Sequence, residues 1–162
     1  MPSARTLHVA CVFGALLAMV VPAPAHAHAG DGQLAAASAF AKQIVRLIGE
    51  NRYAEAWASL YPLHQEAAPL DRYVACEDLT PIPGRITSLR TMRAWHAPVD
   101  IAGLPDRIPG TKVTLRIVIT DASIAARAII VKTVGIVRAG ERWAWMLPPE
   151  RYAAYLAGTC PR

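Results

Sequence analysis

The sequence lacks the short motifs that identify most nucleotide-binding, zinc-dependent and hydrolytic proteins. Its 162 residues contain no Gly-rich phosphate loop, no His-Glu-x-x-His pattern, no Gly-x-Ser-x-Gly turn and no Cys-x-x-Cys pair. Internal repeats are also missing, and the Ala-rich beginning is the only tract of low complexity. These absences exclude the enzyme classes that depend on such motifs, and they indicate no cofactor.

Clusters of positive charge are missing too. The chain carries 17 basic and 12 acidic residues, a net charge of +5, and 14 of the basic residues are Arg. No run of four basic residues occurs, whereas nucleic-acid-binding proteins gather their basic residues on one face. The composition therefore predicts a solvated surface and no nucleic-acid partner, with weak attraction to anionic cell-surface polymers as the alternative.

Long hydrophobic runs are confined to the first 29 residues. Arg5 precedes an apolar run, Val9–Val21, and Pro22–Ala29 then offers several small-x-small cleavage sites. This order is typical of a secretory signal peptide, and the run is too short to cross a bilayer of ~30 Å as a helix. A membrane anchor is the alternative, whereas a lipoprotein is excluded because His8 stands where a lipid site at Cys11 needs a small or aliphatic residue. We expect an exported protein, extracellular, periplasmic or in the cell envelope, with no transmembrane segment after cleavage.

Cysteine is scarce, and its distribution indicates one disulfide. Cys11 falls within the predicted signal peptide, residues 1–29. The remaining residues, 30–162, are enough for a single domain with a hydrophobic core and contain Cys76 and Cys160. Two cysteines in an exported chain predict a bond between them, worth at most about 4–5 kcal/mol by chain entropy. Two free buried thiols are the alternative.

Hydrophobic spacing divides the domain into a helical part followed by strands. Helices are expected over residues 34–48, 53–60 and 69–77, strands over 85–96, 112–121, 128–138 and 142–147, a last helical turn over 150–156, and a long loop over 97–110. Alternation in the second strand places four apolar residues on one face, Val113, Leu115, Ile117 and Ile119. Helices followed by an antiparallel meander predict an α+β fold, with the N-terminal helices packed on one face of a curved antiparallel sheet.

The order of these features resembles a known family. The residues that carry the likeness are Tyr53, Ala54, Ala56, Trp57, Leu60, Tyr61 and Pro62, then Tyr73 and Cys76-Glu77, then Gly140-Glu141-Arg142-Trp143 with Trp145 and Met146. Over about residues 34–160 the chain resembles the nuclear transport factor-two-like superfamily, a cystatin-like, cone-shaped α+β fold, and especially its small exported bacterial members of unknown function. The resemblance implies a cavity between sheet and helices. It also implies a homodimer through the sheet face, which an exposed apolar face around Val118 and Ile130 would support.

The resemblance leaves catalysis open, because the superfamily holds isomerases, dehydratases and cyclases beside non-catalytic pocket proteins. The enzymes need an acid or base inside the cone. No short motif here supplies one, and we expect five candidates to be surface or capping residues, namely His64, His96, Asp100, Asp106 and Asp121. We therefore predict no catalytic residue.

Large aromatic rings are the better candidates for a pocket. The predicted lining residues are Tyr53, Tyr61, Tyr73, Trp95 and Trp145, with the tyrosine hydroxyls as donors. Ordinary core packing is the alternative for such rings.

A copper site at the N-terminus is a further hypothesis. Cleavage after Ala25 would expose His26-Ala27-His28, and a free amine, backbone nitrogens and a third-position His bind Cu²⁺ in a square plane. The alternative is that His26 and His28 only surround the cleavage site, and cleavage after Ala29 would remove both.

Together these observations predict an exported, non-catalytic domain that binds a small apolar ligand or an envelope partner. A pocket enzyme of the isomerase, dehydratase or cyclase kind is one alternative. A buried carboxylate or His facing Tyr53, Tyr61 or Tyr73 would favour it. A purely structural or interaction domain is the other alternative.

Overall fold

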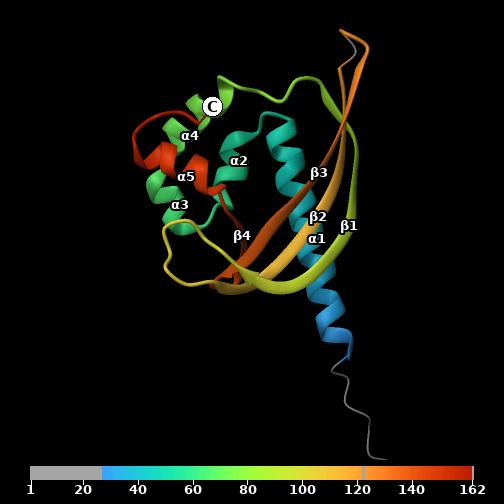
Figure 1. The fold of residues 1–162 in the computed structure, drawn as a ribbon, viewed down its shortest axis with the longest axis vertical. Helices are drawn as coiled ribbons and strands as arrows, with labels where there is room; N and C mark the ends of the chain where they lie inside the picture. Colours follow the sequence, from blue (N-terminus) through green and yellow to red (C-terminus); the bar gives the residue numbers. More distant parts are fainter. Residues whose placement is uncertain (1–26, 122, 162) are drawn as a thin grey trace, which may run out of the picture.

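The computed structural model describes residues 27–121 and 123–161, with side chains from residue 30 onwards. Its elements are α1 (Ala27–Gly49), α2 (Tyr53–Ala58), α3 (Pro62–Ala67), α4 (Leu70–Asp78), β1 (Arg85–Val99), β2 (Ile108–Asp121), β3 (Ala126–Ala139), β4 (Arg142–Trp145) and α5 (Pro149–Leu156). The strands form one antiparallel sheet in the order β1-β2-β3-β4. Figure 1 shows the long strands curving past α1, with the shorter helices gathered on its other side. The predicted α+β class, helices followed by an antiparallel sheet, is confirmed.

The first helix begins at Ala27, earlier than the predicted start at residue 34. Ala is the strongest helix former, and the Ala-rich segment extends the helix upstream in spite of Gly30 and Gly32. The helix therefore crosses the predicted boundary between residues 29 and 30. Residues 1–26 of the predicted signal peptide lie outside the described residues. Within the described ranges, no helix is both long enough and apolar enough to cross a membrane.

A short helix, α3, was not predicted. Pro62 was expected to end the preceding helix, and α2 does end before it, at Ala58. Pro62 also starts α3, because the first turn of a helix tolerates a residue without a backbone N–H. This second role of Pro62 changes the environment of His64, which belongs to α3 and not to a loop.

The first three strands are longer than predicted, and the loop between β1 and β2 is shorter, whereas β4 ends at Trp145, before the predicted end at residue 147. The predicted loop over residues 97–110 contributes residues at both ends to the sheet, where Pro98 pairs with Pro109. Both prolines occupy tolerated positions, since β1 is an outer strand and Pro109 stands at the start of β2.

One hydrophobic cluster joins α1 to the sheet. The four alternating residues of β2 are at most 8% exposed, and they pack with Ala37 and Ala41 of α1; they are Val113, Leu115, Ile117 and Ile119. The predicted alternation is therefore confirmed, and we call this side of the sheet the α1 face. On the opposite face of β2, Val118 is buried as well.

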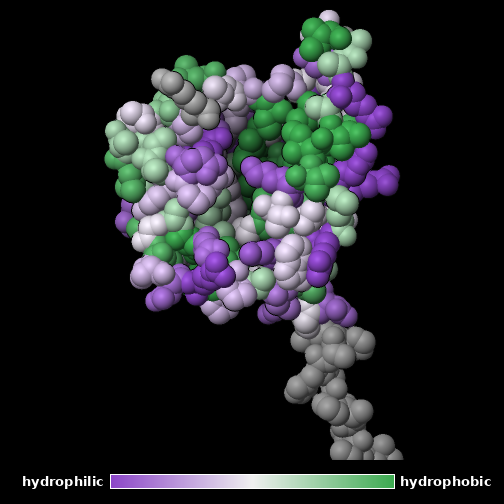
Figure 2. Space-filling model, in the orientation of Figure 1, coloured by the Kyte–Doolittle hydropathy of each residue, from purple (hydrophilic) through white to green (hydrophobic). Residues whose placement is uncertain are grey.

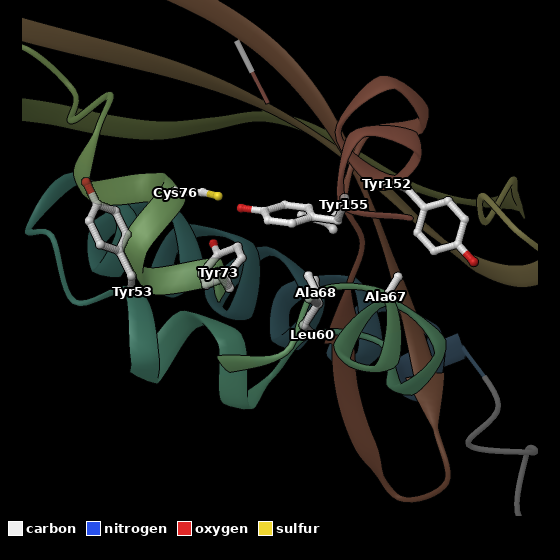
Figure 3. Close-up of a cluster of buried hydrophobic side chains, with 9 residues drawn as sticks. Tyr53, Leu60, Ala67, Ala68, Tyr73, Cys76, Tyr152 and Tyr155 are labelled. Carbon is white, nitrogen blue, oxygen red and sulfur yellow. The ribbon is translucent and has the colours of Figure 1, made fainter. Parts of the chain in front are cut away.

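The short helices enclose a second cluster, drawn in Figure 3. Tyr53 of α2, Tyr73 of α4 and Tyr155 of α5 are each almost fully buried in it. The rings of Tyr73 and Tyr155 have their centres 6.0 Å apart. This cluster holds α5, the last helix, against α2 and α4.

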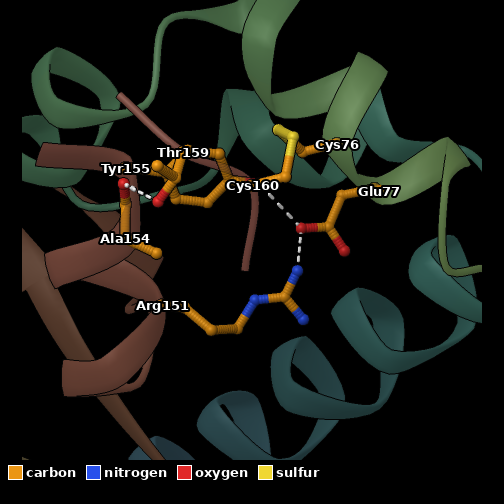
Figure 4. Close-up of a disulfide and its surroundings, with 7 residues drawn as sticks. All are labelled: Cys76, Glu77, Arg151, Ala154, Tyr155, Thr159 and Cys160. Carbon is orange, nitrogen blue, oxygen red and sulfur yellow. Dashed lines mark hydrogen bonds and ion pairs between the residues drawn. A yellow bond between two sulfur atoms is a disulfide. The ribbon is translucent and has the colours of Figure 1, made fainter. Parts of the chain in front are cut away.

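The predicted disulfide is confirmed: Cys76 of α4 is bonded to Cys160, which follows α5 (Figure 4). The two Cα atoms are 5.2 Å apart, within the ordinary range for a disulfide. The bond ties the chain end to the helical layer.

The strand β3 is paired on both sides over only part of its length. It pairs with β2 from Ala126 to Val137, but β4 reaches only Ile136–Ala139. Among the described residues, Ala126–Gly135 has no strand on its second side. In Figure 1 the hairpin formed by β2 and β3 projects beyond the rest of the fold.

Candidate functional site

A groove lies where β4 ends. Pro148 and Pro149 cannot continue the ladder, so the chain leaves the sheet after Trp145 and the segment Met146–Glu150 separates from β3. The space between this segment and β3 is a cavity of about 490 Å³ with α1 as its floor. Figure 2 shows a hollow with a hydrophobic interior between the strands and the short helices.

The interior of the groove is apolar, and its border is charged. The floor consists of Ile44, Val45 and Ile48, which are neighbours on one side of α1. The walls contribute Val99, Val134, Ile136, Trp145, Met146 and Leu147. The charged lining residues are exposed or half-buried and stand at the border: Asp100, Lys112, Lys132 and Glu150.

Gly135 keeps the wall of the groove close-packed. A Cβ atom at this position would lie 2.6 Å from Val99 Cγ1 and 3.0 Å from Met146 Cε, closer than ordinary contact. A larger residue would therefore displace Val99 or Met146, both of which line the groove.

The two tryptophans predicted for the pocket lie in different places. Trp145 lines the groove, and its Nε1 donates a hydrogen bond of 2.7 Å to Ala56 O, which fixes the ring. Trp95 is on β1, where the guanidinium of Arg93 lies 4.7 Å from the ring centre. Trp95 does not line the groove.

The three tyrosines predicted for the pocket lie away from the groove as well. Tyr53 and Tyr73 belong to the helical cluster, and Tyr53 Oη donates to Asn51 Oδ1 at 2.7 Å. Tyr61 is half-buried and packs against a separate small cluster around Val99 and Ile101. The structure therefore brings only Trp145 of the five predicted residues to the groove.

Sequence reasoning missed the remaining lining residues. Ile44 and Ile48 fall within the helix predicted over residues 34–48, for which the sequence indicates no pocket. The groove exists because the chain leaves the sheet at one point, and Pro148-Pro149, shortly after Trp145, is the signal that could have located it.

Glu77 forms a buried polar cluster beside the disulfide (Figure 4). Its carboxylate is 5% exposed, forms an ion pair with Arg151 and accepts a hydrogen bond of 3.0 Å from Tyr155 Oη. Burial, reinforced by the charge of Glu77, raises the pKa of Tyr73 and of Tyr155. Both hydroxyls therefore stay protonated. No local pattern could have predicted the pair, because Glu77 and Arg151 are 74 residues apart.

His64 is fully buried, so its prediction as a surface or capping residue was wrong. Unpredicted α3 turns it inward, where its ring stacks at 4.6 Å on Tyr152 of α5. The backbone N–H of Leu147 donates to Nδ1 at 3.0 Å, and Nε2 lies 2.9 Å from Ala102 O. These partners require the neutral ring with its proton on Nε2, and burial lowers the pKa accordingly. His64 thus fastens a wall of the groove to the loop after β1.

The other four titratable candidates lie outside the core. His96, Asp100 and Asp106 are exposed, and Asp100 forms an ion pair of 2.6 Å with Arg107. Asp121 caps the turn after β2, where Oδ1 accepts hydrogen bonds from the backbone N–H and the hydroxyl of Ser123.

The copper hypothesis concerns atoms beyond the described part of the chain. His26 lies outside the described residues, and for His28 only the backbone, within α1, is described. Comparison with known proteins adds no assignment: no family model, no curated protein and no solved structure matches this chain.

Proposed function

We propose that this protein is an exported, non-catalytic domain that binds a small apolar molecule in the groove between α1, β3 and Met146–Glu150. The observation that carries the proposal is the groove itself. It is about 490 Å³ in volume, apolar inside, and open to solvent. Natural ligand pockets are of this size and consist of apolar walls with few polar groups.

The border of the groove indicates which end of a ligand faces solvent. Asp100 is neutralised by Arg107, whereas Lys112 and Lys132 have no ion-pair partner among the described residues. A ligand with an apolar body and one polar or acidic end fits this arrangement, because its polar end can remain hydrated beside an ammonium group at the border.

Two further features support the proposal. A disulfide between α4 and the chain end suits an oxidising compartment outside the cytoplasm. The order of helices and strands, with space between α1 and the sheet edge, is in keeping with the proposed likeness to the cone-shaped nuclear transport factor-two-like superfamily.

A pocket enzyme is the second candidate, because a buried carboxylate does lie among tyrosines. Burial, together with the charge of Glu77, raises the pKa of Tyr53, Tyr73 and Tyr155. However, its carboxylate is bound by Arg151 and Tyr155, and it does not line the groove. The ring nitrogens of His64 are likewise both bonded to backbone atoms. These contacts favour structural roles for both residues.

Native mass spectrometry of the protein, purified from the envelope and secreted fractions of its producing cells, tests the proposal. We expect a bound apolar molecule, and we expect Val45→Trp, which fills the groove from α1, to lower its affinity at least about tenfold. Leu79→Trp is the control, since Leu79 is 71% exposed and away from the groove. Equal affinity in V45W and the wild type would contradict the proposal, and turnover of the bound molecule would favour the enzyme.

A further inference from the structure

The unpaired edge of β3 is apolar on both faces. Its register with β2 places Ile130 on the α1 face, opposite Ile117, and places Ile129 and Val131 on the opposite face. Ile129 is 52%, Ile130 41% and Val131 59% exposed. Figure 2 shows a hydrophobic patch on the strands beside the hollow.

This edge carries few of the features that prevent strands from pairing with other chains. Ala126–Ala139 contains no Pro, and its register with β2 runs without a bulge. Two basic residues, Arg127 and Lys132, are its only charges before Gly135. A long, regular, apolar edge of this kind is a template for another strand.

We propose that the edge pairs with the same edge of a second copy, antiparallel about a two-fold axis at Ile130, and that each copy's hairpin tip closes the groove of the other. The pairing is independent of the ligand, whereas the closure rests on the proposed function.

The register follows from the symmetry. In a continuous sheet the side chains of facing residues lie on the same side, and an axis at Ile130 centres the pairing on the free segment Ala126–Gly135. Ile129 then faces Val131 of the second copy, an apolar pair on the opposite face. Ala128 faces Lys132 of the second copy, so no two like charges stand opposite each other.

Charge favours a second copy as the occupant. β3 contains no acidic residue, so an acidic side chain outside the paired strands would complement its basic residues. In this register Arg127 of the second copy faces Thr133, which shares the groove border with Glu150. Glu150 has no ion-pair partner among the described residues, so the chain supplies the complement to its own edge.

The same register completes the groove. With Ala126 of the second copy facing Val134, the turn before it lies beside Gly135, which lines the groove next to the point where Ile136 pairs with Trp145. This turn carries Ile124, which is 71% exposed in one copy. Ile124 of the second copy would therefore cover the apolar opening.

Disulfide trapping tests the position of the axis. Ile130→Cys places two thiols across the axis, whereas Met92→Cys places an exposed thiol on the other edge of the sheet, in β1. In the oxidised chain with Cys11→Ser, which removes the third native cysteine, we expect at least about tenfold more covalent dimer for I130C than for M92C. Equal trapping at both positions, or a foreign chain trapped at I130C, would overturn the proposal.

Sedimentation tests the pairing without cysteine chemistry. Val131 and Met92 are both 59% exposed, so Val131→Lys and Met92→Lys add the same charge at equally exposed positions on the two edges. We expect a concentration-dependent dimer in the wild type and in M92K, and a monomer in V131K with an unchanged circular dichroism spectrum. A wild type that is monomeric at every concentration, or a dimer weakened equally by both substitutions, would overturn it.

Binding of an apolar dye separates the two parts of the inference. If the groove is closed by the second copy, V131K releases the dye at least about tenfold faster than M92K. Equal release rates would overturn the closure while leaving the proposed function intact. A dimer that binds no dye would contradict the proposed function while leaving the pairing intact.

Discussion

The two outer edges of the sheet are built in opposite ways. The β1 edge is irregular, with register shifts between Ile86 and Ser88 and between Thr91 and Arg93, and it contains Pro98. It also carries three arginines, Arg85, Arg90 and Arg93. The β3 edge has a regular register, no proline and an apolar centre.

This difference shows how one sheet can limit its own association. Bulges, prolines and charged side chains prevent pairing at an edge, and β1 has all three. One protected edge and one open edge allow a closed pair of molecules, because pairing through β3 alone leaves no second open edge for growth.

The largest loss of stability should come from a substitution in β2, the strand that lies between β1 and β3. Leu115 of β2 is fully buried under α1, and Leu115→Ala should lower the free energy of unfolding by about 2–5 kcal/mol. Ile129→Ala, on the open edge, should change the stability of the monomer by less than about 0.5 kcal/mol. Urea denaturation at low protein concentration measures both. Similar losses would show that the β3 edge is buried in the monomer.

A smaller loss of stability should follow from acidification. It concerns His64, which is bonded to Leu147 in the groove wall beside β3. Burial lowers the pKa of His64 below its unfolded value of about 6.5, so the folded protein binds fewer protons than the unfolded chain. Stability is then fully present above that value and decreases as the pH falls below it. Protonation of Nδ1 also breaks the bond from Leu147, in the groove wall. Tyr61 and Tyr152 are the aromatic rings in contact with His64.

Thermal unfolding between about pH 7 and pH 5 measures this dependence. His64→Gln should weaken the dependence of stability on pH. It should also lower stability by about 1–3 kcal/mol, because it disturbs a buried hydrogen-bonded group. His96→Gln, at an exposed position on β1, should leave it unchanged. A profile that is the same in H64Q and the wild type would contradict the assignment.

Opening the protected edge should alter the size of the assembly more than its stability. Replacing Arg90 and Arg93 with Thr removes two charges from β1, and we expect a fraction of species larger than a dimer because one of the three features that protect this edge is then weakened. Light scattering against concentration measures this. Arg46→Thr with Arg72→Thr, exposed positions on α1 and α4, is the control. If the control also aggregates, the loss of net charge alone explains the larger species.

The smallest expected effect is electrostatic. Glu150→Gln should weaken the dimer about two- to fivefold, as expected for an exposed ion pair with Arg127 of the second copy, and high salt should erase the difference. Sedimentation at two salt concentrations measures it. Asp106→Asn, also exposed, should have no effect.

Local patterns in the sequence predicted the parts of the molecule that depend on neighbours in the chain. Alternation in β2 located the buried face, and the two cysteines outside the predicted signal peptide identified the disulfide. The burial of His64 could not be predicted, because it depends on Ala102 and Leu147, far away in the sequence. The groove was missed for the same kind of reason. Its floor is on α1, but its existence depends on where the chain leaves the sheet after Trp145.

The disulfide also has a consequence for damaged molecules. Cys76 and Cys160 are 84 residues apart, and every strand of the sheet lies between them. The projecting turn between β2 and β3 is the kind of exposed tip that proteases cut first. A chain cut there consists of two fragments, yet both remain in one covalent molecule. A nicked copy therefore keeps its parts together until a reductant reaches the bond.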